Sequence, residues 1–301
     1  MNSVMERPVV KESSLPAGRG LTWQSAYGYP RNFLGNRYVY VVVSPRARGL
    51  SLGVNLNPDK ECNFDCTYCE VNREAPKPDA VLDADRMAAE LERTLRFVDE
   101  GRLGELPLYS HVPPELLRLR HVALSGDGEP TLCPRFAEAV QAVIHVRAVG
   151  QFPFFKIVLI TNASGLDRPD VQDGLKFLTS LDEIWAKLDA GTQAYMDKIN
   201  RAQLPLEKIL ANILAIARQR PIIIQSLFPS LNGQPPPEAE IEEYVQRLKE
   251  LKEAGAQISR VQIYSATRPT PHSECGHLPL KTLSRIAQNV WRNAGLTAEV
   301  F

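Results

Sequence analysis

The 301-residue sequence lacks an excess of either charge, because 35 Lys and Arg residues balance 35 Asp and Glu residues. A chain without net charge has no global positive field to draw in nucleic acid or an anionic membrane. Long apolar runs are missing as well. Stretches such as Tyr38 to Val43 and Ile222 to Ile224 are far shorter than the roughly 20 residues that span a bilayer. We therefore expect no transmembrane helix.

A secretory signal, internal repeats and low-complexity tracts are also missing. The first residues include Glu6, Lys11 and Glu12 and contain no continuous apolar core, so we expect the protein to stay in the cytoplasm. Cysteine is scarce, since there are five in all and three of them lie within eight residues. This arrangement is poor for a disulfide framework and good for a metal site.

What remains is the composition of a folded globular protein, with 44% hydrophobic and 23% charged residues. Short apolar runs alternate with longer segments whose apolar residues recur at helical spacing. We expect strands at Tyr38–Val43, Leu52–Leu56, His121–Leu124, Ile157–Ile160, Ile184–Leu188, Ile222–Ile224, Val261–Tyr264 and 297–300. We expect helices at Leu82–Val98, Phe136–Val146, Val171–Leu178, Leu206–Ala217, Glu238–Ala254 and Leu280–Ala294.

Counting from Leu52, six strands alternate with helices, which predicts parallel βαβ units with right-handed crossovers. The expected fold class is α/β, a partial (βα)6 barrel. We divide the chain into an irregular N-terminal extension at 1–37, a barrel core at 38–270, and a C-terminal loop, helix and edge strand at 271–301. In such folds the reactive groups lie in the loops at the carboxyl ends of the strands.

The first of these loops carries Cys62, Cys66 and Cys69. Eight fully extended residues would span about 26 Å, so the loop must curl to bring three sulfurs onto one ion or cluster. Three soft sulfurs suit zinc or iron–sulfur, and three ligands leave one metal position open for a substrate or cofactor. The alternatives are unmetallated thiols and a zinc site completed by a distant Cys275, His272 or His277.

The next loop, Ser125–Pro130, contains two glycines that let the backbone turn tightly and approach a ligand. Glu129 projects a carboxylate there, and a carboxylate can hold an ammonium group. A glycine-rich turn after a strand is also an ordinary structural feature.

Together, the Cys-x3-Cys-x2-Cys loop and the Gly-Asp-Gly-Glu-Pro turn resemble the radical S-adenosylmethionine (SAM) superfamily, whose fold is a partial (βα)6 barrel. The two motifs occur in the right order and at the ends of the right strands, and the resemblance covers about residues 50–265. The segments Gly53–Pro58 and Gly126–Leu132 are similar to the wyosine-synthase-like iron–sulfur oxidoreductase branch of that superfamily.

The resemblance implies that Cys62, Cys66 and Cys69 ligate three irons of a [4Fe-4S] cluster, and that SAM chelates the fourth iron. It also implies that Tyr68 packs near the adenine of SAM. Three residues of the second motif would hold the methionine amino group: Asp127, Gly128 and Glu129. In this chemistry a reduced cluster passes one electron to the sulfonium of SAM, which yields methionine and a 5′-deoxyadenosyl radical that abstracts hydrogen.

Polar residues also occupy the ends of the later strands. Thr161, Asn162, Lys187 and Gln225 are candidates for binding SAM or the substrate, whereas Asn162 and Asp189 could instead cap the turns that follow. Lys187 lies in an otherwise apolar strand, and a buried ammonium needs a partner. We therefore name Lys187 as a catalytic candidate.

A loop after the last core strand carries His272, Cys275 and His277. One interpretation makes Cys275 a catalytic hydrogen donor or places the histidines on the substrate. The other is a polar surface loop. Cys133 is interpreted as a packed thiol and not as a ligand.

The sequence differs from the pattern of wyosine-forming enzymes in its cysteines, which makes that function less favoured. No cysteine precedes Cys62, whereas a wyosine-forming enzyme of archaeal type is expected to carry a second cluster on N-terminal cysteines. We expect one cluster, reduced by an external ferredoxin or flavodoxin because no flavodoxin-like domain is visible. No membrane partner is expected.

Three hypotheses therefore stand. The first is a single-cluster radical SAM enzyme that acts on an unidentified small molecule or peptide. The second is a radical SAM enzyme that modifies a tRNA base, although zero net charge gives no positive support for tRNA. The third is a non-catalytic zinc or iron–sulfur electron-transfer protein.

Overall fold

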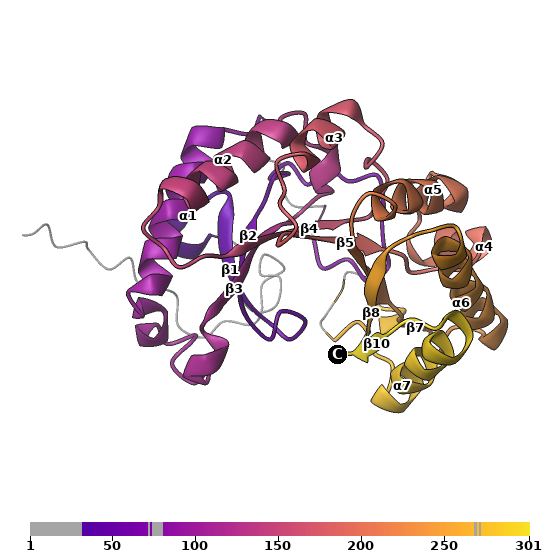
Figure 1. Cartoon of the computed structure of the whole chain (residues 1–301). Coiled ribbons are helices and arrows are strands. Elements are labelled where there is room, and N and C mark those ends of the chain that lie inside the picture. Colours follow the sequence, from indigo (N-terminus) through magenta and orange to yellow (C-terminus); the bar gives the residue numbers. More distant parts are fainter. Residues whose placement is uncertain (1–31, 72, 74–80, 268–269, 271) are drawn as a thin grey trace, which may run out of the picture.

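A curled eight-stranded sheet forms the centre of the protein (Figure 1). The computed structural model describes residues 32–71, 73, 81–267, 270 and 272–301, so most of the expected N-terminal extension lies outside the described residues. The strands stand in the order β1 (Val39–Ser44), β2 (Gly49–Val54), β3 (Leu119–Leu124), β4 (Lys156–Thr161), β5 (Glu183–Lys187), β6 (Ile222–Leu227), β8 (Ile258–Tyr264) and β10 (Ala298–Val300). β1 is antiparallel to β2, and the pairs from β2 to β10 are parallel.

Helices cover the convex face of this sheet (Figure 1). They are α1 (Ala84–Asp99), α2 (Phe136–Val149), α3 (Pro169–Leu175), α4 (Gln193–Ile199), α5 (Leu206–Ala217), α6 (Glu238–Glu253) and α7 (Leu280–Asn289), the last continued by a π-helical turn at Val290–Ala294. Short 3-10 turns lie at Phe33–Gly35, Arg102–Glu105, Pro114–Leu116 and Pro130–Leu132. The short strands β7 (Ser230–Leu231) and β9 (Cys275–Gly276) form a separate antiparallel pair. Within the described ranges, no helix is long and apolar enough to cross a membrane.

The alternation of parallel strands with covering helices confirms the expected α/β partial barrel. The predicted helices and strands are present, with ends that differ by a few residues. Helix α4 and the short strands β7 and β9 were not predicted. The antiparallel direction of β1 was not predicted either, because hydrophobic patterning does not encode it.

Side chains alternate across each strand, so one face packs under the helices and the other lines the hollow of the sheet. On β3, Val122 and Leu124 belong to the main apolar core, whereas His121 and Ala123 line a cavity on the concave face. The same alternation on β5 turns Lys187 toward the cavity. This register explains how a lysine fits into an otherwise apolar strand.

An ion pair between Arg147 of α2 and Asp182 fixes that helix to the sheet. Arg147 Nη1 lies 2.6 Å from Asp182 Oδ1, and the Asp182 carboxylate also accepts the backbone N–H groups of Ile157 and Thr179 at 2.8 Å each. Burial alone would raise the pKa of Asp182, but the Arg147 guanidinium and these N–H groups outweigh it and hold the pKa below its usual value.

We predict that Asp182→Ala lowers the free energy of unfolding by about 3–5 kcal/mol, because the buried Arg147 charge loses its partner. Urea denaturation at neutral pH measures the loss. Since the folded-state pKa of Asp182 is lowered, its contribution is complete above the unfolded pKa of about 4 and is lost as the pH falls below that value.

Asp173→Ala is the matched control. Asp173 pairs with Lys176, and the two side chains are 64% and 74% exposed, so its loss should cost less than about 1 kcal/mol. Equal losses of stability in the two variants would contradict the role given to Asp182.

Candidate active site

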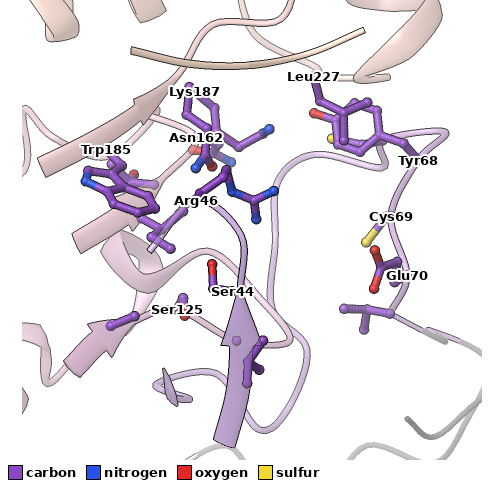
Figure 2. Close-up of a pocket in the computed structure, with 18 of the residues that line it drawn as sticks. Ser44, Arg46, Tyr68, Cys69, Glu70, Ser125, Asn162, Trp185, Lys187 and Leu227 are labelled. Carbon is purple, nitrogen blue, oxygen red and sulfur yellow. The ribbon is translucent and has the colours of Figure 1, made fainter. Parts of the chain in front are cut away.

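The carboxyl ends of the parallel strands open into one cavity of about 330 Å³ on the concave face of the sheet (Figure 2). Its lining includes the three clustered cysteines and the turn Gly126–Glu129, so the fold brings the two sequence motifs together. Five further predicted residues line the same cavity: Tyr68, Thr161, Asn162, Lys187 and Gln225. Of the predicted site residues, Cys275 is not among those that line it.

The cysteine loop is held by the end of α4. The backbone N–H of Asp65 donates to the carbonyl of Asn200 at 3.0 Å, and the N–H of Thr67 donates to that of Ile199 at 2.8 Å. A tight turn then follows, in which the N–H of Cys69 donates to the carbonyl of Cys66 at 2.9 Å. These bonds curl the loop, as the spacing of its cysteines requires.

The thiols of this loop are half-buried and none of them forms a disulfide. Burial raises the pKa of Cys62 to about 11 and that of Cys66 to about 12. Two donors approach the sulfurs: Asn200 Nδ2 lies 3.4 Å from Cys66 Sγ, and Arg73 Nη2 lies 3.9 Å from Cys69 Sγ. Within the described ranges, no three His, Cys, Asp or Glu side chains are grouped as ligands of a single metal ion.

The two motifs are bonded directly to each other. Asn55, which precedes the cysteines, donates its side-chain N–H to Asp127 Oδ2 at 2.7 Å, and the backbone N–H of Glu129 donates to the carbonyl of Glu61 at 2.8 Å. The approach is so close that a Cβ on Gly128 would lie 2.0 Å from the Glu61 oxygen. Glycine is therefore required where the turn meets the cysteine loop.

Glu129 is a buried brace within this junction. Its Oε1 accepts from the backbone N–H and the hydroxyl of Thr131 and from the hydroxyl of Thr161, while its Oε2 accepts the backbone N–H of Asn162 at 2.7 Å. Burial raises the pKa of Glu129, and these hydrogen bonds oppose that rise. The predicted contact between Glu129 and the methionine amino group stays a prediction.

Asn162 itself forms the local cap that the sequence left open as an alternative. Its Oδ1 accepts the backbone N–H of Ser164 at 2.9 Å, and its Nδ2 donates to Asn63 Oδ1 at 2.9 Å. Thr161 and Asn162 thus order the loop around Glu129, and their predicted contacts with SAM or substrate stay predictions.

Asp189 is the second junction of the site. Its Oδ2 accepts the hydroxyl of Tyr68 and, at 3.1 Å, the side-chain N–H of Asn200. Its Oδ1 accepts the backbone N–H of Leu227 on β6 at 2.8 Å and lies 3.3 Å from Lys187 Nζ. One buried carboxylate thereby joins the cysteine loop, α4 and two strands.

Lys187 has the partner that its burial demands. Besides Asp189, its Nζ lies 3.2 Å from the Tyr264 hydroxyl and 4.9 Å from the centre of the Tyr68 ring. Burial lowers the pKa of Lys187, but the Asp189 carboxylate outweighs burial and leaves the pKa raised. The side chain is therefore a fixed positive charge in the cavity wall.

The remaining candidates lie around Tyr68. The Tyr68 ring packs with Leu227 and Tyr264, and Cys275 touches this apolar group from β9. Gln225 donates to Gln262 Oε1 at 3.0 Å and accepts from the Tyr264 hydroxyl at 3.3 Å. The roles predicted for Tyr68, Gln225 and Cys275 stay predictions.

Sequence reasoning missed several residues that line the cavity: Tyr40, Arg46, His121, Trp185 and Tyr264. All of them except Arg46 lie in predicted strands, so period-two alternation could have found these four. Arg46 lies in a loop between β1 and β2, where no periodic signal exists.

Residues 56–233, which are more than half of the chain, match the family model of the radical SAM superfamily. The matched segment contains both motifs. The chain belongs to the radical SAM superfamily. The cofactors of this superfamily are a [4Fe-4S] cluster and SAM, as the two motifs predicted. Membership confirms the expected class, radical SAM enzymes, and leaves the reaction open.

Several curated relatives of the chain are named UPF0026 proteins. One from Helicobacter pylori is 27% identical over 187 residues, which are 60% of this chain and 52% of the relative. One from Synechocystis sp. is 25% identical over 236 residues, which are 77% of each protein. The chain spans about half the length of the Helicobacter pylori relatives that it matches.

Two solved structures share the fold. A radical SAM methyltransferase from Sphaerobacter thermophilus superposes with a TM-score of 0.62 at 17% identity, over 89% of this chain and 70% of that one. TYW1 with a lysine-pyruvate adduct bound superposes with a TM-score of 0.55 at 17% identity, over 82% of this chain and 74% of that one. These similarities confirm the partial-barrel fold of the radical SAM type.

We predict that Gly128→Ala destabilises the protein by about 1–3 kcal/mol, because the added Cβ must push the turn away from the Glu61 carbonyl. Gly104→Ala is the control, since its Cβ would meet only Leu117 Cδ1 at 3.6 Å and should change the stability by less than about 1 kcal/mol. Urea denaturation measures both, and equal stabilities would contradict the close contact.

Proposed function

We propose that the protein is a radical SAM enzyme in which Cys62, Cys66 and Cys69 ligate one [4Fe-4S] cluster. It would cleave SAM reductively and abstract hydrogen from a small-molecule or peptide substrate. The observation that carries the proposal is the shared cavity. The three free thiols and the turn Gly126–Glu129 line it together, and the turn is hydrogen-bonded to Glu61, which directly precedes Cys62.

The donor set fits the cluster. Three thiols from one loop face one cavity, and the protein offers neither Cys133 nor Cys275 among the residues that line it. A three-cysteine set leaves one iron open for a ligand other than the protein. The N–H groups of Asn200 and Arg73 that approach the sulfurs would stabilise their negative charge and so adjust the reduction potential of the cluster.

The acidic groups beside the cysteines suit a cationic ligand. Asp127 and Glu129 both line the cavity. Asn55 holds Asp127, and Glu129 is held by Thr131, the Thr161 hydroxyl and the backbone N–H of Asn162. Two carboxylates fixed at that end would attract the ammonium of SAM, and Tyr68 would supply an apolar wall for its adenine.

The chemistry that the bound cofactors supply is one-electron cleavage of SAM to methionine and a 5′-deoxyadenosyl radical. The electron would come from a separate ferredoxin or flavodoxin in the cytoplasm. The chain's own residues would bind SAM, position its ribose carbon toward the substrate, and exclude water from the hollow of the sheet.

Lys187 is assigned the role of a fixed cation and not of an amine nucleophile. TYW1 is the neighbour whose structure contains a lysine-pyruvate adduct. An adduct of that kind needs a neutral amine, whereas Lys187 is paired with Asp189 at 3.3 Å.

The balanced net charge of the chain also provides no support for tRNA binding, so we favour a smaller substrate.

We predict that Cys66→Ala abolishes iron loading and 5′-deoxyadenosine formation after anaerobic reconstitution with dithionite and SAM. Cys275→Ala is the control, and it should keep both. An unchanged iron content in Cys66→Ala would contradict the assignment of Cys66 as a cluster ligand. A wild-type protein that holds zinc and no iron would favour the non-catalytic alternative instead.

We further predict that Asp127→Asn weakens SAM binding by about tenfold or more while iron loading persists, because one charge-assisted contact to the ammonium is lost. Asp59→Asn is the control: it removes an acid of the neighbouring segment before Cys62 that does not line the cavity, and it should leave the affinity unchanged. Isothermal titration of SAM into reconstituted protein measures both variants. Equal affinities would remove Asp127 from the SAM site.

A further inference from the structure

The cavity continues below the cysteine loop to the floor of the sheet. Ser51 on β2 is in register with His121 on β3, and both line the cavity. His121 lies three residues before the end of its strand, which places it about 10 Å below the carboxyl ends where the motifs lie. The functions assigned above to cluster and SAM leave this floor without a role.

Arg46 reaches into the cavity from the hairpin that joins β1 to β2 (Figure 2). Its guanidinium carbon lies 4.1 Å from the centre of the Tyr264 ring. Within the described residues its Nε is buried and makes no hydrogen bond, and no carboxylate forms an ion pair with it. Three carboxylates line the same cavity, those of Glu70, Asp127 and Glu129, but among the described residues none of them forms an ion pair with Arg46. An anion bound in the cavity would neutralise this buried charge.

The contrast with Lys187 strengthens this point. Lys187 Nζ lies 5.4 Å from the same Tyr264 ring, so two positive charges approach one aromatic side chain. Asp189 balances Lys187, but its other oxygen is taken by Tyr68. Asp189 therefore does not neutralise the positive charge of Arg46.

His121 is a second donor in the same cavity, and it is near enough to Arg46 for the guanidinium charge to act on its ring. The His121 side chain is 2% exposed, its ring lies edge-on to Trp185 at 5.3 Å, and its Nδ1 has no hydrogen-bond partner among the described residues. Burial, Lys156 and Arg46 together lower the pKa of His121 to about 4, so the ring is neutral and can donate one N–H. Buried polar atoms in proteins are normally satisfied, and a ligand would satisfy this one.

The cavity lining thus carries charges of both signs. Glu70, Asp127 and Glu129 belong to the cysteine loop and the glycine turn, whereas Arg46 lies against Tyr264 at the carboxyl end of β8, and the neutral His121 lies deeper in the sheet with Trp185. The face of the Arg46 guanidinium is stacked on Tyr264, which leaves its N–H edge for a ligand. That edge matches the paired oxygens of a carboxylate or a phosphate.

We propose that Arg46 and His121 form an oxyanion subsite that binds a carboxylate or phosphate group of the substrate, with the apolar part of the substrate against Trp185. The assignment of this ligand as the substrate rests on the proposed function. The binding of the anion itself does not.

The test is isothermal titration of sodium acetate and, separately, of inorganic phosphate into the reconstituted full-length protein, with sodium chloride at matched ionic strength. We expect saturable binding of at least one of the two probes, and the one that binds identifies the oxyanion. Arg46→Gln should weaken that binding by about tenfold or more, and His121→Gln should weaken it as well.

Arg48→Gln is the matched control on the same hairpin. Arg48 is 73% exposed and pairs with Glu299 at 3.6 Å, so its loss should leave the affinity within about twofold. Heats that equal those of chloride for both probes, or binding that survives unchanged in Arg46→Gln, would overturn the subsite.

The same samples separate the two proposals. If wild-type protein forms 5′-deoxyadenosine but binds neither probe, the oxyanion subsite is wrong and the radical SAM reaction stands. If the protein binds a probe through Arg46 but holds no iron, the oxyanion subsite stands and the proposed reaction is wrong.

Discussion

The site depends on one contact between segments that are far apart in the sequence. Residues 55–61 and the turn Gly126–Glu129 bind each other through backbone and side-chain hydrogen bonds, at a distance that admits no side chain on Gly128. Glu129 carries this contact into the sheet, because its carboxylate accepts hydrogen bonds from Thr131, Thr161 and Asn162. A carboxylate this deeply buried is stable only where its oxygens are satisfied. The cysteine loop is thereby positioned by the barrel's own loops.

Asp189 performs the corresponding task on the other side of the cavity, where it joins Tyr68, Asn200 and Lys187. Between these two junctions the cavity carries charges of both signs: carboxylates lie beside the cysteines, and Arg46 is a positive charge that has no ion-pair partner among the described residues. This charge distribution favours a cationic cofactor near the carboxylates and an anionic substrate near Arg46. The charges are in place before either ligand binds.

Much of this could be predicted from the sequence, for physical reasons. The βαβ alternation could be predicted because strands and helices differ in the period of their apolar residues. The two site motifs could be located because their cysteines and glycines directly follow predicted strands. Helix α4 was missed although its buried Tyr195, Met196 and Ile199 stand at helical spacing, and although α3, which is equally short, was predicted. The pairing of Lys187 with Asp189 was not predicted, since it depends on which side chains share a face. Arg46 was missed because a loop residue acquires its role only when the sheet curls over it.

The most direct test of the account is the electron paramagnetic resonance spectrum of the dithionite-reduced, reconstituted protein before and after SAM is added. The account predicts the signal of one reduced [4Fe-4S] cluster, and a change in that signal when SAM occupies the iron that the three cysteines leave open. A cluster signal that SAM does not alter, or iron-loaded protein with no such signal, would contradict it.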